Sequence, residues 1–239
     1  MSTNVIVLLA VTSIIAALIA GRFHLKLKEK QREAFIRNYI WPPRLLDKLT
    51  EKYPQFTRKE TSLISHGLRQ FFLAYLKSGR KYVAMPSQVA DDLWHEFILY
   101  TRDYQAFCNG AFGRFLHHTP AVRLEPNQKS SNAGLRRVWW HSCKEESINP
   151  RNPSRMPLLF ALDTKYKIPN GYVYKTNCES LRRNGASGTQ CGGDFASSSV
   201  DGGTDGFGDS GSSSGDSTSG DGGGGDSGSS CGGGCGGGD

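Results

Sequence analysis

The first pattern along the chain is an apolar run that contains no charged residue. Residues 5–20 read VIVLLAVTSIIAALIA, and Asn4 and Gly21 extend the uncharged run to eighteen residues. As a helix with a rise of about 1.5 Å per residue, this run is about 27 Å long, close to the ~30 Å hydrocarbon thickness of a bilayer. No basic residue precedes it and no small-x-small cleavage pattern ends it, which argues against a cleavable signal peptide. We therefore predict one N-terminal transmembrane helix over residues 4–21.

Basic residues follow this run and none precedes it. The next segment, residues 22–43, begins with Arg22, Lys26, Lys28, Lys30 and Arg32. Because basic loops stay on the cytosolic side of a membrane, we expect the N-terminus outside and the remainder of the chain in the cytosol. We also expect these five side chains to lie at the membrane surface, against anionic lipid headgroups.

Beyond residue 44, apolar positions recur with helical spacing. Thr57 and Glu60 have the spacing of a capping box, and the helix that they begin carries apolar residues at i, i+4 and i+7 as far as Ser78-Gly79. Similar patterns predict helices over residues 44–52, 87–108, 133–146 and 158–168, followed by a β-prone stretch at 172–176. The sequence thus predicts a mainly α-helical fold, with a compact helical domain over residues 44–183.

The helix predicted over residues 87–108 separates its residues into two faces. At 100° per residue, one stripe faces the core: Val89, Leu93, Phe97, Tyr100, Tyr104, Phe107 and Cys108. The opposite, polar side holds Asp91, Asp92, His95, Glu96, Arg102 and Asp103. His95 lies almost opposite the centre of the stripe, so we do not expect it to be a packed core histidine.

Charge and composition change sharply near residue 184. Up to residue 183 the chain has 29 basic and 14 acidic residues, a surplus of +15, whereas the remainder has eight Asp and no Lys or Arg. From Gly185 onward, 22 of 55 residues are Gly, and Ser and Asp supply most of the others, so we predict a disordered acidic tail over residues 184–239. Its last cysteines, Cys231 and Cys235, are close enough for a disulfide or a metal, but we favour a plain tether. The six cysteines of the chain are irregularly spaced, and we expect free thiols in a reducing compartment.

One group of residues could bind a divalent metal. Asp92 and His95 are three positions apart on one predicted helix, and His117 and His118 follow after a short loop. Imidazole and carboxylate ligands suit zinc or iron. The structural alternative is a solvated polar face on which His95 and one histidine of the pair make hydrogen bonds between helices. Cys108 lies toward the core stripe and away from His95.

The stretch VAMPSQVADDLWHEFILYTRDYQAFC, followed by FGRFLHH, resembles the bacterial branch of the glycine-rich domain-containing protein-like family, whose biochemical role is unassigned. The resemblance covers about residues 44–175 and includes the glycine-rich tail. Its motif residues are Trp94, His95, Tyr104, Cys108 and either His117 or His118. Plant-like relatives often read WHxH, whereas Phe97 occupies the position of that second histidine here. The resemblance implies a bacterial protein, and with the predicted topology it implies the inner (cytoplasmic) membrane.

Three functions remain open from the sequence. The leading one is a membrane-anchored cytosolic interaction or scaffolding module, with the lipid bilayer and a protein as partners, because no complete catalytic set is visible. The second is a metal-dependent hydrolase or oxidoreductase that uses Asp92, His95 and His117 or His118. The third is nucleic-acid binding by the basic body, where Arg136-Arg137 and Trp139-Trp140 mix cations with aromatics; for these four residues we favour a helix core with a basic outer face.

Overall fold

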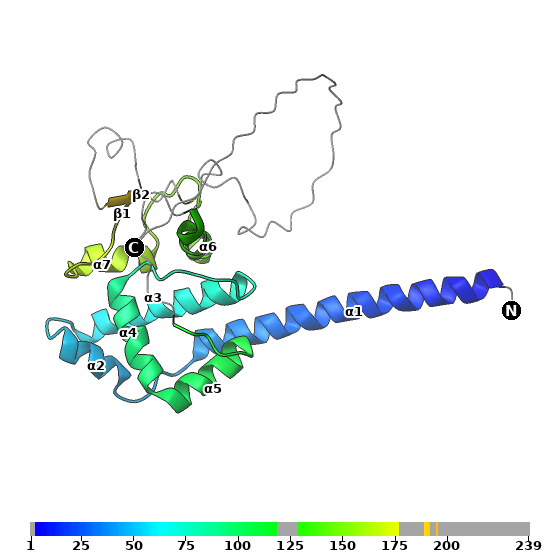
Figure 1. Cartoon of the computed structure of the whole chain (residues 1–239), viewed down its shortest axis with the longest axis horizontal. Helices are drawn as coiled ribbons and strands as arrows, with labels where there is room; N and C mark the ends of the chain where they lie inside the picture. Colours follow the sequence, from blue (N-terminus) through cyan, green and yellow to red (C-terminus); the bar gives the residue numbers. More distant parts are fainter. Residues whose placement is uncertain (1–2, 119–128, 177–188, 192–194, 196–239) are drawn as a thin grey trace, which may run out of the picture. The chain divides into compact units, whose positions relative to one another are not determined.

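The computed structural model describes residues 3–118, 129–176, 189–191 and 195, which all belong to one structural unit, Met1–Gly208. The described part of the chain forms seven helices and a two-stranded sheet (Figure 1). The helices are α1 (Thr3–Asn38), α2 (Leu45–Lys52), α3 (Arg58–Lys77), α4 (Gln88–Leu99), α5 (Thr101–Phe112), α6 (Lys129–Glu145) and α7 (Leu158–Tyr166). The strands are β1 (Val173–Lys175) and β2 (Thr189–Cys191). The prediction of a mainly α-helical fold is confirmed.

The long helix α1 joins two segments that the sequence analysis separated at residue 21. It is continuous from Thr3 to Asn38, so most of the basic segment predicted over residues 22–43 is helical. Among the residues that the structure describes, no helix is both long enough and apolar enough to cross a membrane. The transmembrane helix over residues 4–21 therefore stays a prediction from the sequence.

The C-terminal end of α1 is attached to the domain by Arg69 of α3. Its guanidinium donates hydrogen bonds to the backbone carbonyls of Ile36, Arg37 and Tyr39, at and just beyond the end of the helix, where carbonyls lack a partner within the helix. Three ion pairs between α1, α3 and α6 add to this attachment: Arg37–Glu145, Lys77–Glu33 and Lys77–Glu145. Arg37 also pairs with Glu33 within α1. Arg32, which the sequence placed at the membrane surface, is half-buried, and its guanidinium lies against Gly113.

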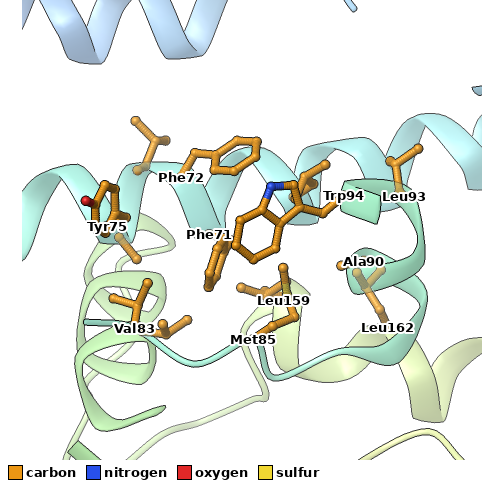
Figure 2. Close-up of a cluster of buried hydrophobic side chains, with 14 of the residues drawn as sticks. Phe71, Phe72, Tyr75, Val83, Met85, Ala90, Leu93, Trp94, Leu159 and Leu162 are labelled. Atoms are coloured by element: carbon orange, nitrogen blue, oxygen red, sulfur yellow. The ribbon is translucent and has the colours of Figure 1, made fainter. Parts of the chain in front are cut away.

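Helix α3 is the centre of the domain, and α1, α2, α4, α6 and α7 all pack against it. It begins with the predicted capping box, because Thr57 accepts a hydrogen bond from the Glu60 amide while Glu60 accepts one from the Thr57 amide. Figure 2 shows how the indole of Trp94 lies beside Phe71 and Phe72 of this helix. The ring centroids of Phe71 and Trp94 are 5.0 Å apart, an ordinary separation for packed aromatic rings. The core is thus built around aromatic contacts between α3 and α4.

The helix predicted over residues 87–108 is in fact two helices. The backbone of Tyr100, with φ −78° and ψ 62°, ends α4 and begins α5. The expected core stripe still holds, since all its members are buried except Tyr100, which is partly buried. The polar face differs from the prediction, because Asp91 and Asp92 are each only 6 % exposed. Contacts from other parts of the chain cover them, as described below.

The predicted tail contains residues that belong to the folded domain. Strand β1 lies within the predicted β-prone stretch and confirms it. Strand β2, residues 189–191, pairs with β1 in parallel. Phe195 is 5 % exposed and packs against Trp139, Phe160 and Tyr174. The prediction that the disordered tail starts at residue 184 is therefore wrong, because residues 189–191 and Phe195 belong to the folded domain. The predicted disorder of residues 196–239, which include Cys231 and Cys235, lies outside the described residues.

Helix α6 uses its mixed basic and aromatic residues for internal contacts. Trp139 is fully buried and its indole donates to the carbonyl of Pro150, at 3.0 Å. Arg136 is 3 % exposed and donates to the carbonyl of Phe195, while Arg137 donates to that of Tyr82. The predicted helix core is therefore confirmed, whereas the predicted basic outer face is wrong for these residues, because Arg136 is buried and Arg137 is half-buried. Cys108 and Cys143 are buried free thiols, as expected.

Candidate metal centre

The start of helix α4 is fixed by a buried carboxylate from α7. The side chain of Ser87 caps the helix by accepting a hydrogen bond from the amide of Ala90. Asp163, only 3 % exposed, accepts hydrogen bonds from the Ser87 hydroxyl and from the amides of Gln88, Val89 and Tyr172. An acidic group at a helix N-terminus is favoured by the unpaired amides and by the helix dipole. The first turn of α4, which leads directly to the candidate site, therefore has a defined position.

Three side chains that could bind a metal converge beyond this turn. Asp91 and His95 are four positions apart on α4, and Nδ1 of His95 is 3.8 Å from an Asp91 carboxylate oxygen. Nε2 of His118 is 2.8 Å from the other carboxylate oxygen, and the two imidazole centroids are 4.1 Å apart. One ligand atom from each residue lies within 4.8 Å of the others, so a single ion could contact all three.

Tyr104 of α5 holds the segment that presents His118. Its hydroxyl donates a 2.5 Å hydrogen bond to the carbonyl of Leu116 and accepts one of 3.2 Å from the Trp94 indole. Burial raises the pKa of Tyr104, which keeps this hydroxyl protonated and able to donate. Burial also raises the pKa of Cys108, although hydrogen bonds to the Leu116 backbone and to Tyr104 oppose the shift. The imidazole of His118 then packs on the Trp94 ring, with 4.5 Å between centroids.

Two of the predicted ligands are not part of the cluster. Asp92 accepts hydrogen bonds from the Tyr53 hydroxyl, at 2.6 Å, and from the Gln88 amide group, and it forms an ion pair with Lys52. Both of its carboxylate oxygens therefore serve to join α2 to α4. His117 is exposed and its ring lies on Phe115, with 4.8 Å between centroids. The predicted set of Asp92, His95, His117 and His118 is thus replaced by Asp91, His95 and His118.

Solvent reaches the cluster from one side. The side chain of His95 is 52 % exposed, whereas those of Asp91 and His118 are 9 % and 13 % exposed. One carboxylate oxygen and two imidazole nitrogens are ligands that suit zinc or ferrous iron. Three protein ligands leave further coordination positions for water or another small ligand, which is the arrangement of catalytic rather than structural zinc sites. The described residues therefore fit a metal ion at the surface of α4.

Comparison with known proteins connects this geometry to a family. The model of the UCP032817-like family matches residues 31–195, which is more than half of the chain. The chain belongs to this family. The UCP032817-like region contains the whole Asp91–His95–His118 cluster and ends at Phe195, the last residue of the described core. The resemblance to glycine-rich domain-containing proteins stays a prediction from the sequence. Comparisons with curated proteins and with solved structures gave no match.

Sequence reasoning identified most of this site and missed one residue. Trp94, His95, Tyr104, Cys108 and His118, all members of the proposed family motif, come together within the UCP032817-like region. Asp91 was missed because it adjoins Asp92 on the same polar face of α4. Spacing gave no signal that would separate the two, because positions three and four before His95 both lie beside it on a helix. Which of the two carboxylates is free for a metal depends on Tyr53 and Lys52, which are distant in sequence.

Proposed function

We propose that the UCP032817-like region binds a divalent transition-metal ion through Asp91, His95 and His118. The observation that supports this function is the convergence of these three side chains within 4.8 Å, from two separate segments of the chain. The hydrogen bonds of Tyr104 favour the proposal because they position the backbone just before His118. Metal ligands held in this way require little reorganisation when the ion binds.

The side of the cluster that faces solvent indicates what the ion would do. Open coordination positions allow a bound water or a small oxygen-containing ligand to be polarised by the ion. This supports a metal-dependent activity such as hydrolysis or oxidation at the surface of α4. The interaction or scaffolding role and nucleic-acid binding remain predictions from the sequence, since no contact among the described residues favours either of them.

The chain provides a closely matched control for a test of metal binding. His117 and His118 are adjacent, but only His118 contacts Asp91. We expect the full-length protein, freed of metal by chelation, to bind one zinc or cobalt(II) ion in a titration followed by calorimetry. His118→Ala should weaken metal binding by about 100-fold or more. Loss of a residue that only orients a ligand costs about 10–100-fold in affinity, and His118 is itself a proposed ligand. His117→Ala should bind as the unchanged protein does.

A second measurement would report on the ligand set itself. Cobalt(II) in a site with imidazole and carboxylate ligands gives visible absorption that depends on its coordination. We expect this absorption in the unchanged protein and in His117→Ala, and its loss in Asp91→Ala and His118→Ala. Equal affinity for zinc in His118→Ala and His117→Ala would refute the proposal, and would leave the Asp91–His118 hydrogen bond as a structural contact between α4 and the segment after α5.

A further inference from the structure

Helix α1 exposes large apolar side chains on more than one side. Between 47 % and 65 % of the residue surface is exposed for Leu9, Val11, Ile14, Ile15, Leu18 and Ile19. Leu9 and Leu18 are nine positions apart and therefore project from opposite sides of the helix. Thr12 adds little polarity, because its hydroxyl donates to the carbonyl of Leu9. A helix that is apolar around its whole circumference is normally buried in protein or in lipid.

Charged residues begin where the apolar run ends. Arg22, Lys26, Lys28 and Lys30 are all exposed, and Glu29 is the only acidic residue among residues 1–30. Phe23, Leu25 and Leu27 alternate with them and are also exposed. A mixture of basic and apolar side chains next to an apolar helix suits the boundary between acyl chains and anionic headgroups. This charge pattern distinguishes a lipid bilayer from an apolar protein partner.

The exposed part of α1 lies outside the folded domain. Two contacts attach the end of α1 to the domain: Arg32 lies against Gly113, and the ring of Phe35 packs on Phe107 with 6.1 Å between centroids. Ile36 is then 1 % exposed. The UCP032817-like region starts at residue 31, at almost the same position. The preceding residues of α1 therefore contribute little to the core, and their apolar character needs another explanation.

We infer that residues 4–21 of α1 are embedded in a lipid bilayer and that Arg22, Lys26, Lys28 and Lys30 bind its anionic headgroups. Residues 4–21 carry no charged side chain, and Leu9, Ile14 and Leu18 of this run are exposed. The excess of basic residues on the domain side of the run places the domain on the cytosolic side. The continuous helix then connects the bilayer directly to the segment of α1 that Arg69 holds.

Flotation of the full-length protein with liposomes tests this inference. The liposomes contain phosphatidylcholine and phosphatidylglycerol, and the test variant carries Ile15→Glu and Leu18→Glu. The matched control carries Ile40→Glu and Leu99→Glu, which change two domain residues that are 87 % and 71 % exposed. We expect the unchanged protein and the control to float and to resist alkaline carbonate. The test variant should show at least about a tenfold lower ratio of bound to free protein, because charged side chains are unfavourable within a bilayer.

Further measurements separate lipid from other occupants. Thermal unfolding followed by circular dichroism should show that both double variants keep a folded domain. Lys26→Glu together with Lys28→Glu should reduce binding to liposomes that contain phosphatidylglycerol more than binding to pure phosphatidylcholine. Equal flotation of the two double variants would overturn the inference. The inference would also be overturned if the unchanged protein stayed out of the lipid fraction and formed oligomers that the Ile15→Glu and Leu18→Glu variant dissociates. In that case a second copy of the chain, and not lipid, would cover the apolar part of α1.

Discussion

Replacement of Asp163 should strongly destabilise the domain, because this one carboxylate satisfies four donors. One oxygen accepts from the Ser87 hydroxyl at 2.8 Å and from the Val89 amide at 3.2 Å. The other accepts from the Gln88 amide at 2.7 Å and from the Tyr172 amide at 2.9 Å. All of this occurs in a site where Asp163 is 3 % exposed, so water cannot readily replace the carboxylate.

The magnitude follows from how many donors each variant leaves unpaired. Asp163→Ala removes both acceptor oxygens, and the loss of one partner from a buried charged network costs roughly 3–5 kcal/mol. Asp163→Asn keeps one acceptor oxygen but turns an NH₂ group toward the other pair of donors, which we expect to cost about 2–3 kcal/mol. Gly171 packs against the same side chain, and a Cβ at position 171 would lie 2.7 Å from the Cβ of Asp163, so a larger residue does not fit at position 171.

Urea unfolding of the full-length protein, followed by circular dichroism, would measure these differences. Asp103→Asn is a suitable control, since Asp103 is an exposed acidic residue in the first turn of α5. We expect the control to change the free energy of unfolding by less than about 0.5 kcal/mol. A change of similar size for Asp163→Asn would refute the reasoning, because it would mean that the four hydrogen bonds contribute little to the position of α4.

Three further predictions concern single side chains. Tyr104→Phe should weaken metal binding about tenfold by releasing the segment before His118, and unchanged affinity in a zinc titration would contradict this role. Burial, with a smaller effect of Lys77, lowers the pKa of His141 from 6.5 to about 4. As pH decreases, His141 is protonated in the unfolded state before it is protonated in the folded state. The free energy of unfolding should therefore fall by up to about 3 kcal/mol between pH 6.5 and pH 4. Urea unfolding at a series of pH values should show this loss, and His141→Gln should abolish it. Arg69→Ala should increase the rate of amide hydrogen exchange at the end of α1, because the hydrogen bonds to its backbone carbonyls are lost. Arg69→Lys should restore little protection, because lysine lacks the forked guanidinium. Equal exchange rates in the unchanged protein and both variants would show that these hydrogen bonds do not hold the end of α1.

Local chemistry explains what could be predicted from the sequence. The capping box of Thr57 and Glu60 and the apolar spacing that follows it determine where α3 begins and which face it buries, because both depend on neighbours a few residues apart. The same is true of the core stripe on residues 87–108, most of which is buried as expected. The uncharged run at the N-terminus is likewise a property of composition. Spacing also brought His95 and His118 into one candidate site.

Tertiary contacts decided the remainder. Periodicity could not show that the chain bends at Tyr100, because the residues on both sides continue the same apolar pattern. It could not assign Phe195 to the core, since the contacts of that ring come from α6, α7 and β1. Above all, it could not distinguish Asp91 from Asp92. Tyr53 and Lys52, about forty residues earlier in the chain, engage Asp92, and only folding brings His118 to Asp91. Helices arise from neighbours in sequence, whereas this site is formed by residues that are neighbours only in space.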